Sequence, residues 1–150
     1  MSKSLQMQDF HWLMDILQNI DVGLVVLDKN YRVQLWNAFM ENHSGIGPQS
    51  AQDKKIHELF PDIEQKWLEQ KFEPVFFLKT QAFILHQQRP YLFRFSNAKV
   101  ISGLAPFMYQ NVSIIPILDI NREVSHICLI VYDVTALAMA EKAADTPLEN

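Results

Sequence analysis

The chain has 150 residues, of which 49% are hydrophobic, so it is long enough to bury a core as one domain. Its formal net charge of −4 and its lack of a run of Lys and Arg argue against nucleic acid as the main partner. The single cysteine, Cys128, excludes an internal disulfide, and no apolar stretch reaches the roughly 20 residues that cross a bilayer. The N-terminus lacks the apolar segment of a signal peptide. We therefore expect a cytoplasmic protein that neither binds nucleic acid nor inserts into a membrane.

An amphipathic helix is predicted at residues 5–20. Four apolar side chains follow the i, i+3, i+4, i+7 spacing of one helix face: Phe10, Leu13, Met14 and Leu17. Trp12 and Ile16 add a second apolar strip. One strip is enough to pack on a domain. We therefore expect the helix both to cover the sheet and to form a homodimer interface, with Phe10, Leu13, Met14 and Leu17 as the interface residues. The alternative is that both strips are buried in a single groove.

Two strands joined by a tight turn are predicted at residues 24–28 and 31–36. Asp28 and Asn30 suit the turn, because Asp hydrogen-bonds to its own backbone and Asn tolerates a positive φ. In the second strand Val33 and Leu35 alternate with polar residues, which is typical of a half-buried strand.

A short helix is predicted to follow at residues 38–43. Asn37 offers a side-chain oxygen to the free N–H groups of its first turn. Gly45 ends it, because glycine adopts the left-handed conformation without steric cost.

The middle of the chain is predicted to hold a polar loop at residues 47–55, a helical turn at 56–61 and a longer helix from residue 63. Asp62 is the expected N-cap of that helix, with Gln65 as its capping-box partner. Pro74 is expected to end or kink it, because proline lacks the N–H donor and clashes with the previous turn. Residues 75–86 fit a helix and a strand equally well.

Three further strands are predicted, at residues 91–95, 107–118 and 125–134. Pro116 requires an unpaired edge or a bulge, because it cannot donate to a strand ladder. The last strand is apolar on both faces, so we expect it to be central and covered on both sides, with the N-terminal helix over the outer face. Thr135 is expected to cap a helix at 136–144, ahead of a disordered tail at 145–150.

This order of elements is similar to that of the PAS family over residues 9–135. Four motifs carry the resemblance: Asp28-Lys29-Asn30 at the turn, Trp36-Asn37 before the first helix, His57-Glu58-Leu59-Phe60-Pro61 before the long helix, and Asp133-Val134-Thr135 at the exit. The resemblance implies an α+β PAS fold, a five-stranded antiparallel sheet in the order 2-1-5-4-3 with helices on one face and flanking N- and C-terminal helices. Residues 71–90 depart from a minimal version of the pattern.

The resemblance also implies a domain organisation and structural positions. It divides the chain into an N-terminal helix at 1–20, a PAS domain at 21–135, and an exit helix with its tail at 136–150. Asp28, Asn37, Asp133 and Thr135 are its structural PAS positions.

The function implied is a non-catalytic sensory or protein-interaction domain in bacterial signal transduction. Such a domain relays a signal through its flanking helices to a kinase, diguanylate cyclase or response regulator, in two-component or cyclic-di-GMP signalling. Only 15 residues follow Thr135, so the output lies either in a partner protein or in the rest of a longer chain.

A candidate ligand pocket is indicated by where aromatic residues fall in the PAS fold. Six of them surround its central region: Trp36, Phe39, Phe60, Trp67, Phe93 and Tyr109. The alternative is a filled aromatic core, because bulky side chains pack at near-crystal density.

No metal site or cofactor is expected. The five histidines lack metal-ligand spacing. His86 and then His57 lie nearest to the place where haem-binding relatives have an axial ligand. The first helix lacks the cysteine of light-sensing flavin relatives, and Cys128 fits inert packing in a strand. We therefore expect no cofactor, and haem or a non-covalently bound flavin is the alternative.

No enzyme activity is expected either, because the chain shows no serine nucleophile motif and no glycine-rich phosphate loop. The alternative from another class is a small α+β enzyme of the isomerase or hydrolase kind, with His86 or His57 as its base.

Overall fold

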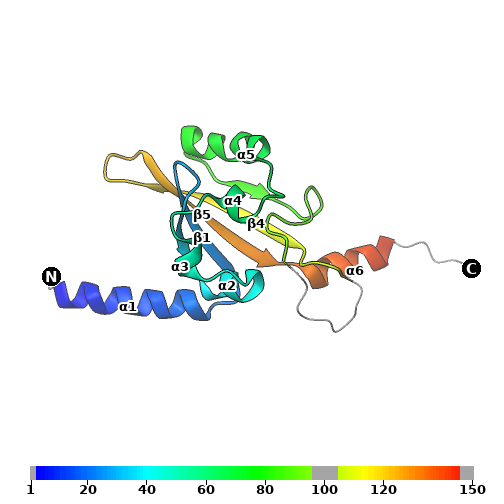
Figure 1. Cartoon of the computed structure of the whole chain (residues 1–150), viewed down its shortest axis with the longest axis horizontal. Helices are drawn as coiled ribbons and strands as arrows, with labels where there is room; N and C mark the ends of the chain where they lie inside the picture. The colour runs from blue at the N-terminus through cyan, green and yellow to red at the C-terminus, as the bar shows by residue number, and fades with distance from the viewer. Residues whose placement is uncertain (1–2, 96–104, 146–150) are drawn as a thin grey trace, which may run out of the picture.

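The computed structural model describes residues 3–95 and 105–145 of the chain (Figure 1). Five strands form one antiparallel sheet in the order β2-β1-β5-β4-β3. The strands are β1 Gly23–Asp28, β2 Val33–Trp36, β3 Ala82–Ile84, β4 Gln110–Leu118 and β5 Val124–Asp133. The predicted strand order and the α+β class are therefore confirmed, with the last strand at the centre of the sheet.

Six helices accompany the sheet in the described part of the chain. They are α1 Lys3–Asn19, α2 Ala38–Ser44, α3 Pro48–Ala51, α4 Ile56–Leu59, α5 Gln65–Leu78 and α6 Thr135–Asp145. The connection from β2 to β3 holds α2 to α5, and these helices close over one face of the sheet (Figure 1). α1 and α6 extend away from the sheet at opposite ends of the molecule. One face of the sheet thus forms the main core.

The β1–β2 turn differs from its prediction in two respects. The second strand begins at Val33 and not at residue 31, because Tyr31 and Arg32 still belong to the turn. Asp28 Oδ1 accepts hydrogen bonds from the backbone N–H groups of Asn30 (2.8 Å) and Arg32 (3.0 Å), as expected of a turn aspartate. The residue with positive φ, however, is Tyr31 at 63° and not Asn30. The ring of Tyr31 lies beneath α5, where it contacts the rings of Phe72 and Phe76.

Asn37 ties three segments together at the start of α2. Its Oδ1 accepts from the N–H of Met40 (3.3 Å), which is the predicted cap, and from the N–H of Leu24 (3.0 Å). Its Nδ2 donates to the carbonyl oxygens of Leu17 (3.0 Å) and Val22 (2.9 Å). Gly45 ends the helix at φ 75°, as predicted.

The expected covering of the outer sheet face by α1 is wrong. The C-terminal end of α1 packs against α2, where the carbonyl of Leu17 accepts a hydrogen bond from Asn37. The rest of α1 extends away from the sheet (Figure 1). On that outer face Leu24 pairs with Ile130 and Val26 with Cys128, and all four stay half-buried.

The long helix starts later than predicted and continues past its proline. It begins at Gln65, with Glu64 rather than Asp62 at the N-cap and without a side-chain cap. Pro74 does not end the helix, which continues to Leu78. Pro74 is exposed, so water can reach the carbonyl left without its usual donor. The ambiguous residues 75–86 therefore hold both the end of α5 and the strand β3.

Two loop predictions also need correction. Residues 48–51 in the predicted polar loop form α3, with Pro48 in its first turn. Residues 91–95 are not a strand, because the buried side chain of Gln110 takes their backbone hydrogen bonds. Its Oε1 accepts from the N–H groups of Leu92 (3.0 Å) and Phe93 (3.1 Å), and its Nε2 donates to the carbonyl of Phe93 (2.7 Å).

The last two strands and the exit follow the prediction closely. β3 pairs with β4 only from Val112 to Ile114, so Pro116 lies beyond it with an unpaired edge, as expected. Thr135 does not cap α6 but is its first residue. Its hydroxyl accepts from the N–H of Tyr109 (3.0 Å) and donates to Asp133 Oδ1 (2.6 Å). The tail predicted to be disordered lies outside the described residues from 146 onward.

Candidate functional site

The aromatic residues predicted to surround a pocket do not all meet. Trp36, Phe60 and Phe93 form one buried cluster, with ring centroids 4.9–6.2 Å apart. Phe39 instead packs on His43 (4.4 Å). This cluster is part of the main hydrophobic core, and other core side chains surround it.

Of the remaining two members, Trp67 packs at the edge of the main core and Tyr109 lies outside it. Trp67 lies under the guanidinium of Arg89, 4.1 Å from the ring centroid. Tyr109 packs on Phe107 in a small second core with Ala138 of α6. A ligand role for the six residues stays a prediction.

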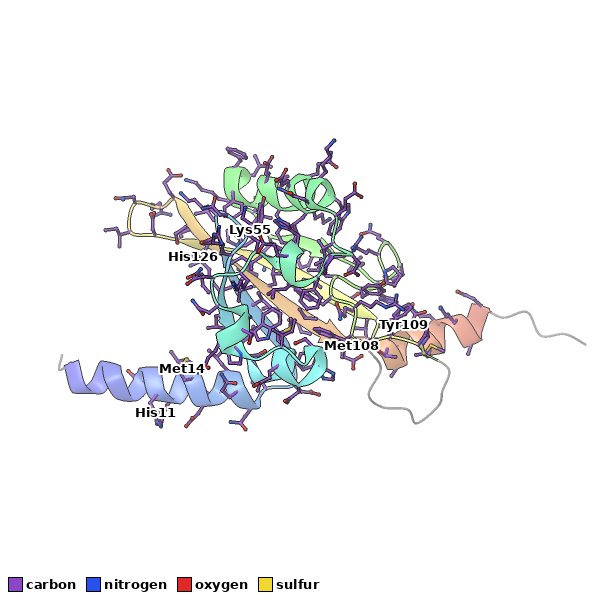
Figure 2. All side chains as sticks on the ribbon, in the orientation of Figure 1. His11, Met14, Lys55, Met108, Tyr109 and His126 are labelled. Carbon is purple, nitrogen blue, oxygen red and sulfur yellow. The ribbon has the colours of Figure 1, made fainter. Side chains whose placement is uncertain are left out.

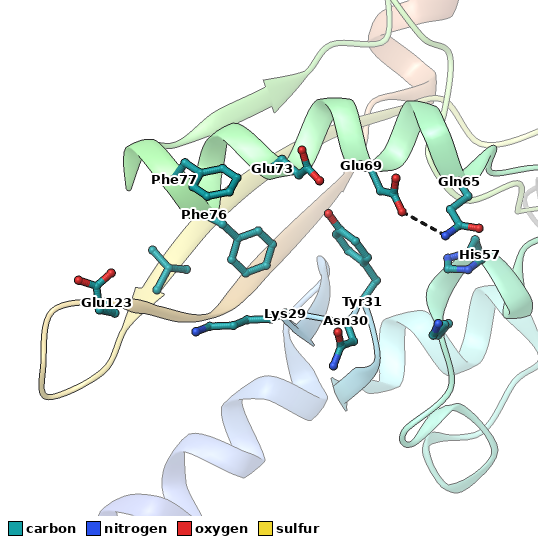
Figure 3. Close-up of a pocket in the computed structure, with 12 residues that line it drawn as sticks. Lys29, Asn30, Tyr31, His57, Gln65, Glu69, Glu73, Phe76, Phe77 and Glu123 are labelled. Atoms are coloured by element: carbon teal, nitrogen blue, oxygen red, sulfur yellow. Dashed lines mark hydrogen bonds between the residues drawn. The ribbon is translucent and has the colours of Figure 1, made fainter.

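An open cleft lies elsewhere, between the β1–β2 turn, α4, α5 and the end of the β4–β5 hairpin (Figure 3). Its volume is about 510 Å³, within the usual range of small-molecule sites. Its lining is mostly charged and aromatic: Lys29, Asn30, Tyr31, Lys55, His57, Gln65, Glu69, Glu73, Phe76, Phe77, Glu123 and Val124. None of the six predicted pocket residues lines it.

Tyr31 and Val124 are the buried residues of this lining, and Tyr31 has 9% of its surface exposed. Burial, and then the negative charges of Glu73 and Glu69, raise its pKa to about 12. The phenol is therefore neutral at physiological pH. The sequence pattern does not single out this residue, because only the folded turn shows that Tyr31 takes the left-handed conformation.

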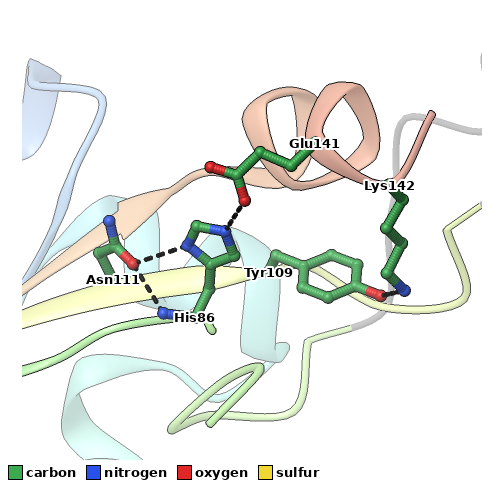
Figure 4. Close-up of polar contacts among 5 residues, drawn as sticks. All are labelled: His86, Tyr109, Asn111, Glu141 and Lys142. Carbon is green, nitrogen blue, oxygen red and sulfur yellow. Dashed lines mark hydrogen bonds and ion pairs between the residues drawn. The ribbon is translucent and has the colours of Figure 1, made fainter. Parts of the chain in front are cut away.

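A second polar cluster, the exit junction, joins α6 to the sheet (Figure 4). His86 is buried, and its Nε2 lies 2.8 Å from Glu141 Oε2 on α6. Its Nδ1 lies 3.1 Å from Asn111 Oδ1, which also accepts from the His86 N–H (2.8 Å). Tyr109, the residue before β4, forms a further hydrogen bond with Lys142 of α6.

The exit junction bears on two sequence hypotheses about His86. Both ring nitrogens are engaged by protein groups, so an axial haem ligand or an exposed base there would have to break these contacts. His57 lines the open cleft, but its Nδ1 is buried and makes no hydrogen bond within the described residues.

Three further features concern metals, thiol chemistry and membranes. Within residues 3–95 and 105–145, no three His, Cys, Asp or Glu side chains come together as metal ligands would. Burial raises the pKa of the Cys128 thiol, which favours the less nucleophilic neutral form. Among the helices described, none combines the length and apolar character that spanning a membrane requires.

Comparison with known proteins identifies the family. The sequence model of the PAS fold matches residues 13–89, more than half of the chain. The chain belongs to the PAS family. Membership confirms the resemblance seen in the four motifs, and it does not favour the alternative of a small α+β enzyme.

Solved PAS structures agree with the fold described above. A sensory box sensor histidine kinase from Vibrio cholerae is 27% identical, with a TM-score of 0.61 over 89% of this chain and 99% of that one. The PAS domain of BvgS from Bordetella pertussis is 17% identical, with a TM-score of 0.64 over 92% and 96%. The PAS domain of a Colwellia psychrerythraea protein is 15% identical, with a TM-score of 0.60 over 85% and 98%. No curated protein matches the chain.

Proposed function

We propose that this PAS domain is a non-catalytic cytoplasmic sensor that passes its signal to a signalling partner through α6. The observation that carries the proposal is the direct passage of the chain from β5 into α6. The central strand β5 runs into α6 through Asp133 and Val134, and no Gly or Pro lies between Arg122 and Thr146. A change in the sheet can therefore reach the helix without a flexible break.

The contacts of α6 are compatible with two arrangements of this helix. Ala138 is buried against Tyr109 and Ala105, but most other side chains of α6 are exposed or half-buried. Glu141 reaches the β3 end of the sheet through His86, and Thr135 reaches the start of β4 through Tyr109. A small interface held by a few polar contacts is the kind of element that a signal can release or redirect.

The partner we propose is a histidine kinase, a diguanylate cyclase or a response regulator, linked in cis or met in trans. Support for the kinase comes from the Vibrio cholerae structure, whose own protein is a sensor histidine kinase. Its likeness to this chain covers almost the whole of both.

We also propose a homodimer that uses α1. Trp12, Leu13 and Ile16 are 52–69% exposed along this helix. Met14 points toward the body of the domain and His11 points away from it (Figure 2). Of the four residues predicted at the interface, Leu13 lies with the exposed strip, Met14 and Leu17 are half-buried, and the Phe10 side chain lies outside the described residues. A second copy would cover this strip and the open face of the sheet.

A chimeric kinase tests the output. The chain through residue 145 is fused to the dimerisation and catalytic core of a histidine kinase, with linkers increasing by one residue at a time. Autophosphorylation should vary with a heptad period, because a continuous helix turns the core as it lengthens. Glu141→Ala should change the rate about fivefold, the scale of a modest coupling energy.

The matched control is Asp145→Ala, which alters an exposed residue at the end of the same helix. Rates that do not depend on linker length and do not respond to Glu141→Ala would contradict an output role for α6.

A further inference from the structure

The lining of the open cleft beside Tyr31 includes none of the exit-junction residues and none of the six aromatic residues predicted to surround a pocket. Its floor comes from the β1–β2 turn and its opposite wall from α5 (Figure 3). Phe76 forms an apolar part of the wall and packs edge-on against the Tyr31 ring, with centroids 6.2 Å apart. The cleft therefore combines an aromatic surface with charged groups on two sides.

Tyr31 is strained and unpaired in this cleft. Its φ of 63° is an outlier for a bulky residue. Its hydroxyl makes no hydrogen bond to any described residue and is not fully buried, although only 9% of the surface of the residue is exposed. Figure 3 shows the hydroxyl directed toward α5, near Glu69 and Glu73. Strain of this kind persists only where the surroundings enforce it, and it gathers at functional sites.

Two carboxylates share this part of the cleft. Glu69 and Glu73 lie one turn apart on α5, so both side chains reach the same side of the helix. Both raise the pKa of the Tyr31 phenol, which shows that their charges act on it. Glu69 accepts a hydrogen bond from Gln65 Nε2 (3.1 Å). Glu73 has no hydrogen bond or ion pair to any residue described. Together they place two negative charges on this wall of the cleft.

Two lysines line the facing side of the cleft. Neither Lys29 nor Lys55 forms an ion pair with a carboxylate within the described residues, and neither lies within 4.0 Å of Glu69 or Glu73. Glu123 also lines the cleft, but it is paired with Lys79 outside it at 3.5 Å. Opposite charges thus stand on two sides of one cleft without neutralising each other.

We propose that this cleft binds a small zwitterion of the amino-acid class with an apolar side chain. Its ammonium group lies between Glu69, Glu73 and the Tyr31 hydroxyl, its carboxylate lies toward Lys29 and Lys55, and its side chain packs on Phe76. A neutral phenol accepts a hydrogen bond from an ammonium ion, and such charge-assisted bonds are the strong ones. The ammonium is also favoured near the faces of aromatic rings.

Matched probes separate the two charges. Calorimetry on the intact chain compares L-leucine with isopentylamine and 4-methylpentanoate, and L-phenylalanine with 2-phenylethylamine and 3-phenylpropionate. In each set the apolar body is the same, and only the ammonium or the carboxylate is lost. At least one amino acid should bind with a Kd below about 1 mM, and both of its analogues should bind about tenfold or more weakly.

Three outcomes would overturn the proposal. The first is no binding of either amino acid up to about 10 mM, together with no thermal shift from any of the twenty common amino acids. The second is an amine that binds as tightly as its amino acid, because the lysines would then contribute nothing to the affinity. The third is a carboxylate that binds as tightly as its amino acid, because the tyrosine and the two glutamates would then contribute nothing to the affinity.

Variants place the binding in this cleft. Tyr31→Phe keeps the ring and removes only the hydroxyl, and it should weaken the bound amino acid about tenfold, the usual effect of losing a hydrogen bond to a charged group. Glu73→Gln should have a similar effect, and this exposed position on α5 keeps the test valid if Tyr31→Phe disturbs folding. Tyr91→Phe and Glu64→Gln, which lie outside the cleft, should bind as the unaltered chain does. Equal binding by all four variants would overturn the assignment.

Discussion

The Nε2 atom of His86 lies 2.8 Å from a carboxylate oxygen of Glu141, which is 55 residues further along the chain (Figure 4). This contact joins the segment after β3 to the exit helix. The other ring nitrogen of His86 is held by Asn111 of β4. A single histidine thus connects an edge strand, its neighbour and the helix proposed to carry the output.

Removing this contact should loosen α6. Glu141→Ala should raise the hydrogen-exchange rates of residues 136–145 about fivefold, because one partly exposed polar contact contributes about 1 kcal/mol. Exchange followed by mass spectrometry measures it, with Asp145→Ala as the matched control. Addition of the partner or the continuing chain should slow exchange in the same helix. Strong protection in isolation that neither the variant nor the partner changes would rule out the output role.

Asn37→Ala should cost more than the loss of an ordinary helix cap. The cap itself contributes about 1 kcal/mol, but Asn37 is also buried and bonds to Leu24, Leu17 and Val22. Leaving such groups unpaired adds about 1–3 kcal/mol, so we expect a total near 3 kcal/mol. Urea unfolding measures the loss, and Asn42→Ala on the exposed side of α2 is the control. A melt like that of the unaltered chain would show that these bonds contribute little.

Gly23 should not tolerate a side chain. A Cβ added there would lie 2.6 Å from Met40 Sδ and 3.0 Å from both Phe39 Cδ1 and Val131 Cβ. These neighbours are buried and cannot move freely, so Gly23→Ala should lower the free energy of unfolding by about 1–3 kcal/mol. Gly47→Ala is the control, since its Cβ would meet only the end of the Glu41 side chain at 3.3 Å. Equal stability of the two variants would show that α2 can shift away from β1.

Tyr31 should make stability depend on pH at the alkaline end. Its pKa in the fold, about 12, lies above the value of 10.0 expected in the unfolded chain, so the folded state holds the proton more tightly. The contribution to stability is therefore complete below pH 10 and is lost as the pH rises toward 12. Absorbance titration of tyrosinate should show one late-titrating group that Tyr31→Phe removes. An unchanged late phase in that variant would mean that another tyrosine accounts for it.

The proposed dimer depends on the exposed strip of α1. Leu13→Glu places a charge in that strip and should shift the chain from dimer to monomer at micromolar concentration, as seen by light scattering. Gln18→Glu adds the same charge at another exposed position of the helix and should leave the dimer intact. A monomeric chain in which neither substitution matters would contradict the assembly and leave the fold unaffected.

Local sequence signals were sufficient to predict several turns, helix ends and strands of the fold. The turn at Asp28, the capped helix after Asn37 and its end at Gly45 each depend on a few adjacent residues. The apolar character of both faces of β5 correctly indicated a strand at the centre of the sheet. These features were predictable because the chemistry that determines them lies within a few positions of the chain.

Other features came from contacts between distant residues. Residues 91–95 do not form the expected strand, because their backbone hydrogen-bonds to the Gln110 side chain. Pro74 lies inside α5 and does not end the helix. α1 left the outer face of the sheet open because Asn37 fixes its end beside α2.

The sequence by itself therefore determined the family, through it the strand order, and the two ends of α2. Only the tertiary structure decided that Tyr31 takes the left-handed conformation beneath α5 and that His86 meets Glu141. The physical reason is that a strained backbone or a buried polar pair is stable only through packing from several elements at once. No pattern of neighbouring residues contains that information.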